Sequence, residues 1–185
     1  PKNVMLDAGR YFLKKQGRST GLSEKELIFI AVKSMGLDEL APFDANERVI
    51  EYKMQAASEN PLVAKTLVDF ADTTASESPA PGGGSVSAYV GALGAALGTM
   101  VANLSAGKKG WEKQIPYFSD WAEKGQAIKD RLVFLVDEDT RAFNGIITAV
   151  RMPKATDEEK EARKNAMREA TRYAIHIPLE VMKTA

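Results

Sequence analysis

Apolar residues recur with the spacing of an α-helix in the first part of the chain. Residues 4–16 carry this pattern, and Gly17 follows it as the kind of residue at which helices often end. Ser23 and Glu26 have the spacing of a capping box and precede a second apolar run that closes at Gly36. The pattern therefore predicts two helices in this part of the sequence.

Residues 47–53 (ERVIEYK) have the alternating pattern of a short β-strand. No other segment of the sequence is predicted as a strand, and a strand without partners is not stable on its own. We therefore expect residues 1–54 to be the C-terminal remnant of an α/β domain whose other strands lie outside this sequence.

The rest of the chain is predicted to be helical. Residues 55–60 are small and polar, which is typical of a linker. Helical patterns then cover residues 61–70, 86–105, 111–151 and the segment after a second capping box, formed by Thr156 and Glu159. Because the connections are short, residues 61–185 are expected to form an antiparallel helical bundle, incomplete at this length, in a mainly α fold.

Residues 78–107 form a stretch of 30 residues without a charge that holds half of the chain's 14 glycines. Residues 86–104 are long enough to span a bilayer, but alanine and glycine dominate and no aromatic or basic anchor precedes them. A water-soluble helix without charge on any face has to be buried on every face. We expect missing C-terminal helices, a second copy of the chain in a homo-oligomer, or both to cover it, rather than a membrane.

The composition excludes several kinds of partner and catalytic site. The 25 basic and 25 acidic residues give a net charge of zero, which argues against nucleic acid as a partner. The absence of cysteine excludes thiolate catalysis and cysteine-held metals, and the one histidine, His176, is expected to be structural in its apolar context. With no targeting segment in the sequence, the expected compartment is the cytoplasm.

Three glycines, Gly82, Gly83 and Gly84, precede the uncharged helix, and Ser85 is predicted as its N-cap. Glycine leaves backbone N–H groups open to a ligand, and the N-terminus of a helix favours an anion. The spacing is not that of a P-loop. A ligand-binding loop and a flexible turn with positive φ values both fit the sequence.

Asp139 continues the apolar spacing that leads from Leu135 to Phe143, and it is therefore expected to project from the buried face of its helix. Asp137 lies roughly 200° around the helix axis and is expected to point the other way. A carboxylate on a buried face is costly unless it is functional or paired. Asp139 is therefore either a general acid/base or a structural carboxylate that caps a helix or pairs with an arginine such as Arg141.

Several of these segments resemble one known family. Residues 78–86 (SPAPGGGSV) and 135–143 (LVDEDTRAF) resemble two blocks of the cyclodeaminase/cyclohydrolase family. Residues 11–21 and 47–52 resemble the end of a formiminotransferase domain. In this order, the segments resemble the formiminotransferase-cyclodeaminase family over nearly the whole chain.

This resemblance implies an all-helical, oligomeric cyclodeaminase domain that converts 5-formiminotetrahydrofolate to 5,10-methenyltetrahydrofolate and ammonia. It implies a tetrahydrofolate derivative, possibly one with a polyglutamate tail, as the substrate, and no metal or redox cofactor. It also implies that the full-length protein transfers a formimino group from formiminoglutamate to tetrahydrofolate in histidine degradation, with a catalytic histidine upstream of this sequence.

The resemblance also assigns residues. Asp139 matches the family's second block and is the expected acid/base and the more buried carboxylate, with Asp137 as the second candidate. The expected substrate-binding residues are Gly82, Gly83, Gly84, Ser85, Lys108, Lys109 and Arg141, with the lysine pair attracting the acidic glutamate tail. Two alternatives remain: a methenyltetrahydrofolate cyclohydrolase, which the formiminotransferase-like segment argues against, and an inactive helical association module.

Overall fold

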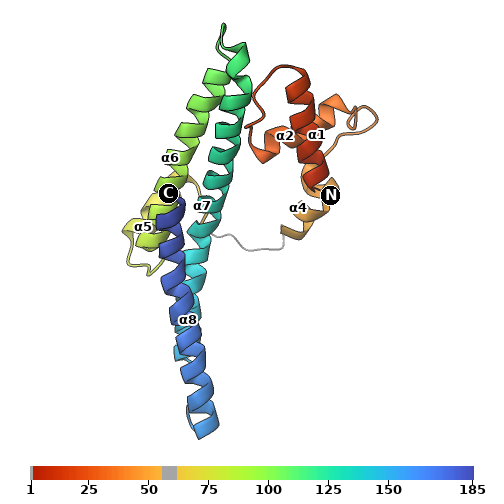
Figure 1. The fold of residues 1–185 in the computed structure, drawn as a ribbon. Helices are drawn as coiled ribbons and strands as arrows, with labels where there is room; N and C mark the ends of the chain where they lie inside the picture. The colour runs from red at the N-terminus through yellow and green to blue at the C-terminus, as the bar shows by residue number, and fades with distance from the viewer. Residues whose placement is uncertain (1, 56–61) are drawn as a thin grey trace. The chain divides into compact units, whose positions relative to one another are not determined.

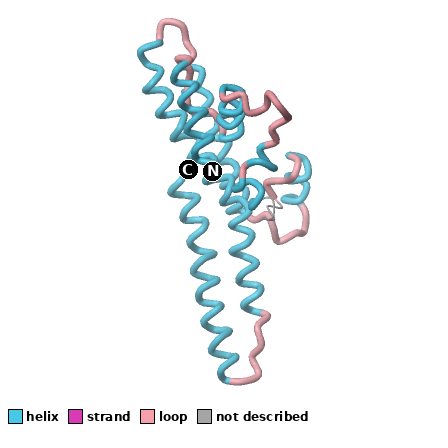
Figure 2. Tube along the Cα trace, turned by 90° about the vertical axis from the view of Figure 1, so that its right-hand side faces the viewer, coloured by secondary structure: helices cyan, strands magenta, loops and turns pink. Residues whose placement is uncertain are grey.

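The computed structural model describes residues 2–55 and 62–185, which consist of helices and loops (Figures 1 and 2). The elements are α1 (Lys2–Lys15), α2 (Glu24–Ser34), α3 (Ala45–Arg48), α4 (Ile50–Gln55), α5 (Leu67–Ala75), α6 (Gly83–Ala106), the 3-10 helix η1 (Glu112–Gln114), α7 (Ile115–Val150) and α8 (Asp157–Thr184). The predicted mainly α fold is confirmed over these residues.

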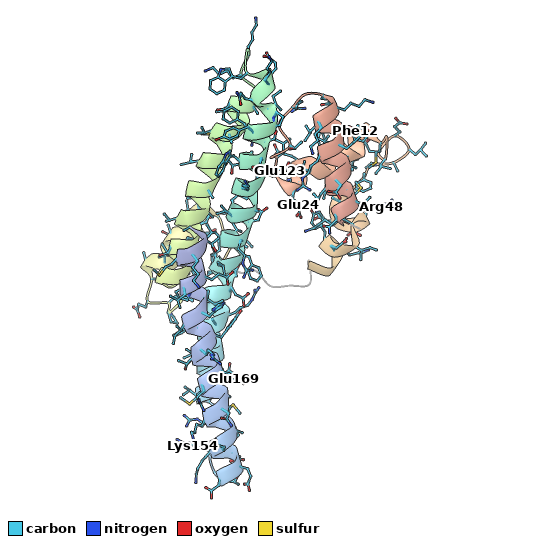
Figure 3. All side chains as sticks on the ribbon, viewed as in Figure 1. Phe12, Glu24, Arg48, Glu123, Lys154 and Glu169 are labelled. Carbon is cyan, nitrogen blue, oxygen red and sulfur yellow. The ribbon has the colours of Figure 1, made fainter. Side chains whose placement is uncertain are left out.

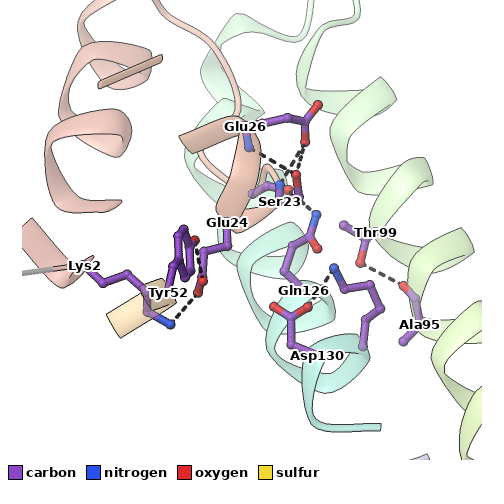
Figure 4. Close-up of polar contacts among 11 residues, drawn as sticks. Lys2, Ser23, Glu24, Glu26, Tyr52, Ala95, Thr99, Gln126 and Asp130 are labelled. Carbon is purple, nitrogen blue, oxygen red and sulfur yellow. Dashed lines mark hydrogen bonds and ion pairs between the residues drawn. The ribbon is translucent and has the colours of Figure 1, made fainter. Parts of the chain in front are cut away.

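The two helices predicted in the first part of the chain are α1 and α2. Gly17 and Gly36 follow them with φ angles of 63° and 67°, which suit glycine at the end of a helix. The capping box of Ser23 and Glu26 is present at the start of α2, with both reciprocal hydrogen bonds formed (Figure 4).

The predicted strand over residues 47–53 is wrong, because this segment forms α3 and α4. Asp44 caps α3 by accepting a hydrogen bond from the Asn46 N–H at 2.9 Å. With no second strand to pair with, the segment satisfies its backbone groups locally, as in the bond from the Tyr52 N–H to the Val49 carbonyl. An α/β remnant is therefore not seen among the described residues, and the linker predicted at 55–60 lies outside them except for Gln55.

The chain divides into two compact units, and α6 and α7 contribute to both. The first unit comprises residues up to 59 together with 95–127, and the second comprises 60–94 and 128–185. The boundary between the two units therefore falls within α6 and within α7.

Close backbone approach shapes the first unit. A Cβ on Gly9 of α1 would lie 2.3 Å from the Leu27 carbonyl oxygen, so only glycine lets α1 and α2 approach at this point. A Cβ on Gly125 of α7 would lie 2.2 Å from the Thr99 hydroxyl oxygen of α6. That hydroxyl donates to the Ala95 carbonyl at 2.8 Å and is thereby satisfied within its own helix (Figure 4).

The second unit has its own hydrophobic core, in which α8 runs back along the C-terminal part of α7 (Figures 1 and 2). The core residues are Leu62, Ala88, Ala92, Leu132, Leu135, Val136, Ala142, Ile177 and Val181. They come from the segment before α5 and from α6, α7 and α8. Of the apolar spacing predicted for α7, Leu132 and Leu135 face this core, whereas Phe143 is 40% exposed. The charged residue Glu169 lies on α8, and Lys154 lies in the connection between α7 and α8 (Figure 3).

The expectation that α6 is buried on every face is not met within this chain. Its small residues Ala88 and Ala92 are buried, but its large apolar residues are 48–68% exposed. These exposed residues are Val90, Leu93, Leu97, Met100, Val101 and Leu104. By length and composition, α6 is also the one helix of the described residues that could cross a membrane, a test that core helices of water-soluble proteins also pass.

Candidate functional site

The start of α6 lies against α7, but Ser85 is not its N-cap. The helix begins two residues earlier, at Gly83, and the Val86 N–H donates to the Gly82 carbonyl oxygen. Ser85 is fully buried, and its hydroxyl donates to the Val136 carbonyl oxygen of α7 at 2.8 Å. The prediction failed because the glycines form the first helical turn themselves, which frees the Ser85 side chain to join the two helices.

Asp139 of α7 is the carboxylate at this helix start. Its Oδ2 accepts a hydrogen bond from the Ser85 backbone N–H at 3.0 Å and lies 3.2 Å from the Ser85 hydroxyl oxygen. Backbone N–H groups in the first turn of a helix lack acceptors within the helix, and the helix dipole favours a negative charge there. The geometry therefore holds the half-buried Asp139 at a fixed place, as expected for a residue on the apolar side of α7.

Gly84 makes the room that this carboxylate occupies. A Cβ at position 84 would lie 2.2 Å from the Asp139 Oδ1, and one at Gly82 would lie 3.7 Å from Oδ2, whereas Gly83 faces open space. None of these three glycines has a positive φ angle. The flexible-turn interpretation is therefore wrong, since Gly84 is required for space rather than for its backbone conformation.

Asp137, and not Asp139, is the buried carboxylate of the pair. It is 3% exposed and accepts hydrogen bonds from the backbone N–H groups of Leu62 at 2.8 Å and Val63 at 3.3 Å. It thereby holds the turn before α5, which begins at Leu67 with Thr66 as its N-cap, later than predicted. These contacts give Asp137 a structural role in this turn, and the expectation that it lies opposite the buried face of α7 is wrong, because the turn at Leu62 covers it.

Arg141 does not pair with Asp139. It donates to the Glu138 carboxylate at 2.9 Å, and the Tyr173 hydroxyl of α8 donates to the same carboxylate. Accepting this hydrogen bond, the Glu138 carboxylate raises the pKa of Tyr173 to about 12. Sequence reasoning missed this cluster, although the three-residue spacing of Glu138 and Arg141 on one helix is a signal for an ion pair.

The remaining predicted site residues are Lys108 and Lys109, which belong to the first unit, whereas Asp139 belongs to the second. The two lysines follow the C-terminus of α6, and the Lys108 ammonium lies 4.3 Å from the centre of the Trp111 ring. His176 is exposed on α8, 3.9 Å from the Glu180 carboxylate, so its predicted apolar setting is wrong. Among the residues that the structure covers, no group of three or more His, Asp or Glu side chains is placed to hold a metal ion.

A family model described as formiminotransferase-cyclodeaminase matches residues 66–185, which is more than half of the chain, and a formiminotransferase domain model matches residues 1–55. The chain belongs to the formiminotransferase-cyclodeaminase family.

Relatives in this family match along nearly the whole chain. Formimidoyltransferase-cyclodeaminase of Gallus gallus is 41% identical over 179 residues, which cover 96% of this chain and 33% of the relative. The protein of the same name from Mus musculus is 37% identical over 185 residues, or 100% of this chain and 34% of the relative. The chain thus spans about a third of the length of these relatives.

A shorter relative matches only part of the chain. Methenyltetrahydrofolate cyclohydrolase of Methylorubrum extorquens is 39% identical over 115 residues, which cover 62% of this chain and 55% of that protein. The two blocks that resemble this family, residues 78–86 and 135–143, contact each other in the structure. The hydrogen bond between Ser85 and Asp139 joins them.

Substitution of Asp137 by asparagine is expected to lower the free energy of unfolding by about 1–3 kcal/mol, because an amide replaces a buried acceptor of two N–H donors. Urea unfolding followed by circular dichroism measures this change. Asp130→Asn is the matched control, since Asp130 is exposed beside Lys129, and its effect should stay within about 0.5 kcal/mol. Equal effects of the two substitutions would mean that Asp137 does not hold the turn before α5.

Proposed function

We propose that this chain carries the catalytic centre of a cyclodeaminase that converts 5-formiminotetrahydrofolate to 5,10-methenyltetrahydrofolate and ammonia. The observation that carries the proposal is the seating of Asp139 on the first turn of α6, in the space left by Gly84. The names of the relatives, which join formimidoyl transfer, cyclodeamination and folate chemistry, support it.

The proposed reaction needs a group that moves a proton. N10 of the folate attacks the carbon of the protonated amidine, whose nitrogen becomes an amino group, and Asp139 accepts the N10 proton as the new carbon–nitrogen bond forms. Asp139 then gives this proton to the amino group on the tetrahedral carbon, so that ammonia leaves and the N5–carbon bond gains double-bond character. No electrons are exchanged with a further reactant, and we propose that no metal or redox cofactor takes part.

The other predicted residues have supporting roles in this proposal. Ser85 positions Asp139 through its N–H group, while Gly82 and Gly83 form the wall that the folate ring approaches. Lys108 and Lys109 attract the acidic glutamate tail. We propose that Arg141 serves substrate binding through its neighbour Glu138 rather than by pairing with Asp139.

We also propose a cellular setting. Residues 1–54 are the end of a formiminotransferase domain and residues 61–185 the first part of a cyclodeaminase domain, with 55–60 as the linker between them. In a protein of the relatives' length, this arrangement would couple formimino transfer from formiminoglutamate to cyclodeamination, in the cytoplasm and as a step of histidine degradation.

The exposed apolar face of α6 is proposed to be the contact between copies of the chain, rather than a lipid-facing or nucleic-acid-binding surface. The double substitution Leu97→Glu with Val101→Glu should therefore convert an oligomer into smaller species, because it places two carboxylates in the contact. Sedimentation velocity measures the change, with the exposed Leu40→Glu outside α6 as the control. An unchanged sedimentation coefficient in the double variant would show that α6 is not the contact.

The proposed function is tested by supplying 5-formiminotetrahydrofolate to a polypeptide of the relatives' full length that contains these residues, and following methenyltetrahydrofolate absorbance and ammonia release. Formation of both products supports the proposal. A protein that only hydrolyses methenyltetrahydrofolate would instead be a cyclohydrolase, the alternative that the Methylorubrum extorquens relative favours. Absence of both reactions in a folded oligomer would support the association-module alternative.

A further inference from the structure

The loop between α1 and α2 includes residues 18–22, here called the strap, which lie within the first unit against α6 and α7. The Gly21 carbonyl oxygen of the strap accepts two hydrogen bonds from side-chain amides. One comes from Asn103 of α6 at 2.9 Å, and the other comes from Gln126 of α7 at 3.2 Å. A single backbone carbonyl therefore bridges two helices that follow it by more than 80 residues in the sequence.

The two residues before Gly21 add contacts to both helices. The Ser19 hydroxyl donates to the side-chain oxygen of Asn103 at 2.5 Å. Thr20 is 2% exposed, its N–H donates to the Ser119 hydroxyl at 3.4 Å, and its own hydroxyl donates to the Glu123 carboxylate of α7 (Glu123 is labelled in Figure 3). The buried polar groups of the strap thus have partners on α6 and α7.

The packing at Gly21 leaves no space for a side chain. A Cβ at this position would lie 2.1 Å from the Cβ of Ala122, which is itself fully buried on α7. The strap backbone therefore touches the helix surface directly, and small residues on both sides permit the hydrogen bonds described above.

We propose that the strap is an interaction surface that holds the formiminotransferase part of the chain against two helices of the cyclodeaminase part. It contacts the C-terminal part of α6 and the N-terminal part of α7. The family match changes between residues 55 and 66, but the compact unit joins residues before this boundary to residues 95–127. The strap makes the hydrogen bonds between these two parts of the unit. The α6–α7 segment within 95–127 is consequently stabilised by the formiminotransferase part. This inference is independent of the role of Asp139.

A cysteine pair tests this contact directly, because the chain has no cysteine of its own. Ser19→Cys with Asn103→Cys should form an intramolecular disulfide under mild oxidation, identified by mass spectrometry of the joined peptides. Ser19→Cys with Val101→Cys is the control, since position 101 lies roughly 200° around α6 from position 103. Cross-linking of the first pair alone, and its loss in urea, supports the strap contact, whereas equal or absent cross-linking of both pairs overturns it.

Hydrogen exchange tests the consequence for stability. Asn103→Leu on α6 should speed exchange of the strap amides by about tenfold or more, and Gly21→Val in the strap should do the same for amides of α7 near Ala122. The control Asn165→Leu, an exposed position of α8, should leave both segments unchanged. Unchanged exchange in both test variants overturns the proposal, and if a variant unfolds altogether, the cysteine pair decides.

Discussion

Asp139→Asn is expected to lower the rate of methenyltetrahydrofolate formation by about 10²–10⁴-fold while the protein stays folded. The asparagine side chain has nearly the same shape, and its carbonyl oxygen can still accept the Ser85 N–H hydrogen bond. It cannot take a proton from N10 and return it to the leaving amino group. The measurement is the absorbance of methenyltetrahydrofolate under saturating 5-formiminotetrahydrofolate, in a polypeptide of the relatives' full length.

Asp130→Asn is the matched control for this substitution, because it makes the same chemical change on an exposed position of the same helix. Its rate should equal that of the unsubstituted protein. Circular dichroism of both variants checks the fold. A full rate in Asp139→Asn would show that this carboxylate is structural and that the proton is moved by another group.

Gly84→Ala is expected to lower the same rate by about 10²-fold, although residue 84 carries no chemistry of its own. The new Cβ would lie 2.2 Å from the Asp139 Oδ1, so the carboxylate has to move away from the Ser85 N–H. A displacement of about 1 Å in a catalytic group is enough for a loss of this size. The stability should also fall, by about 1–3 kcal/mol, since the pocket for the carboxylate is overfilled.

Gly83→Ala provides an unusually close comparison for this prediction. It adds the same methyl group one residue earlier in the same helical turn, where no atom lies within 4 Å of the added Cβ. Since Gly83 is itself proposed to line the folate wall, the comparison rests on stability, which should be equal or slightly higher because alanine favours helix formation. If both glycine variants behaved alike, the space at Gly84 would not matter for the position of Asp139.

The features that the sequence predicted best are those set by neighbouring residues. The capping boxes of Ser23 and Thr156 depend on side chains three positions away, and both are present at the helix starts. The apolar spacing of α7 identified the side that carries Leu132 and Leu135, which are fully buried. It also placed Asp139 on a side that meets another helix, because helical periodicity fixes direction without knowledge of the partner.

The features that the sequence did not predict depend on contacts between distant segments. Asp137 was expected to be the more exposed carboxylate, but the turn at Leu62 covers it and uses both its oxygens. Ser85 was expected to cap α6, but its hydroxyl donates a hydrogen bond to the Val136 carbonyl oxygen of α7 instead. The segment 47–53 alternates like a strand, yet it becomes helical because a strand requires a neighbour to accept its hydrogen bonds.

The burial of α6 was also misjudged from the sequence. An uncharged helix indicates that something covers it, but the pattern does not say whether the cover belongs to the same chain. Within this chain, the small residues Ala88 and Ala92 are covered and the large ones such as Leu97 are not. The pattern thus indicates that α6 needs a cover, but it does not identify which chain or segment provides it.

A double-mutant cycle on the cyclodeaminase rate tests whether Gly84 serves catalysis by making room for Asp139. Rates are measured for the unsubstituted protein, Gly84→Ala, Asp139→Ala and the double variant. If Gly84 acts through the carboxylate, adding Gly84→Ala to Asp139→Ala causes no further loss, because the group that the methyl displaces is gone. If the double variant instead loses the product of the two single effects, the two residues act independently and the account is contradicted.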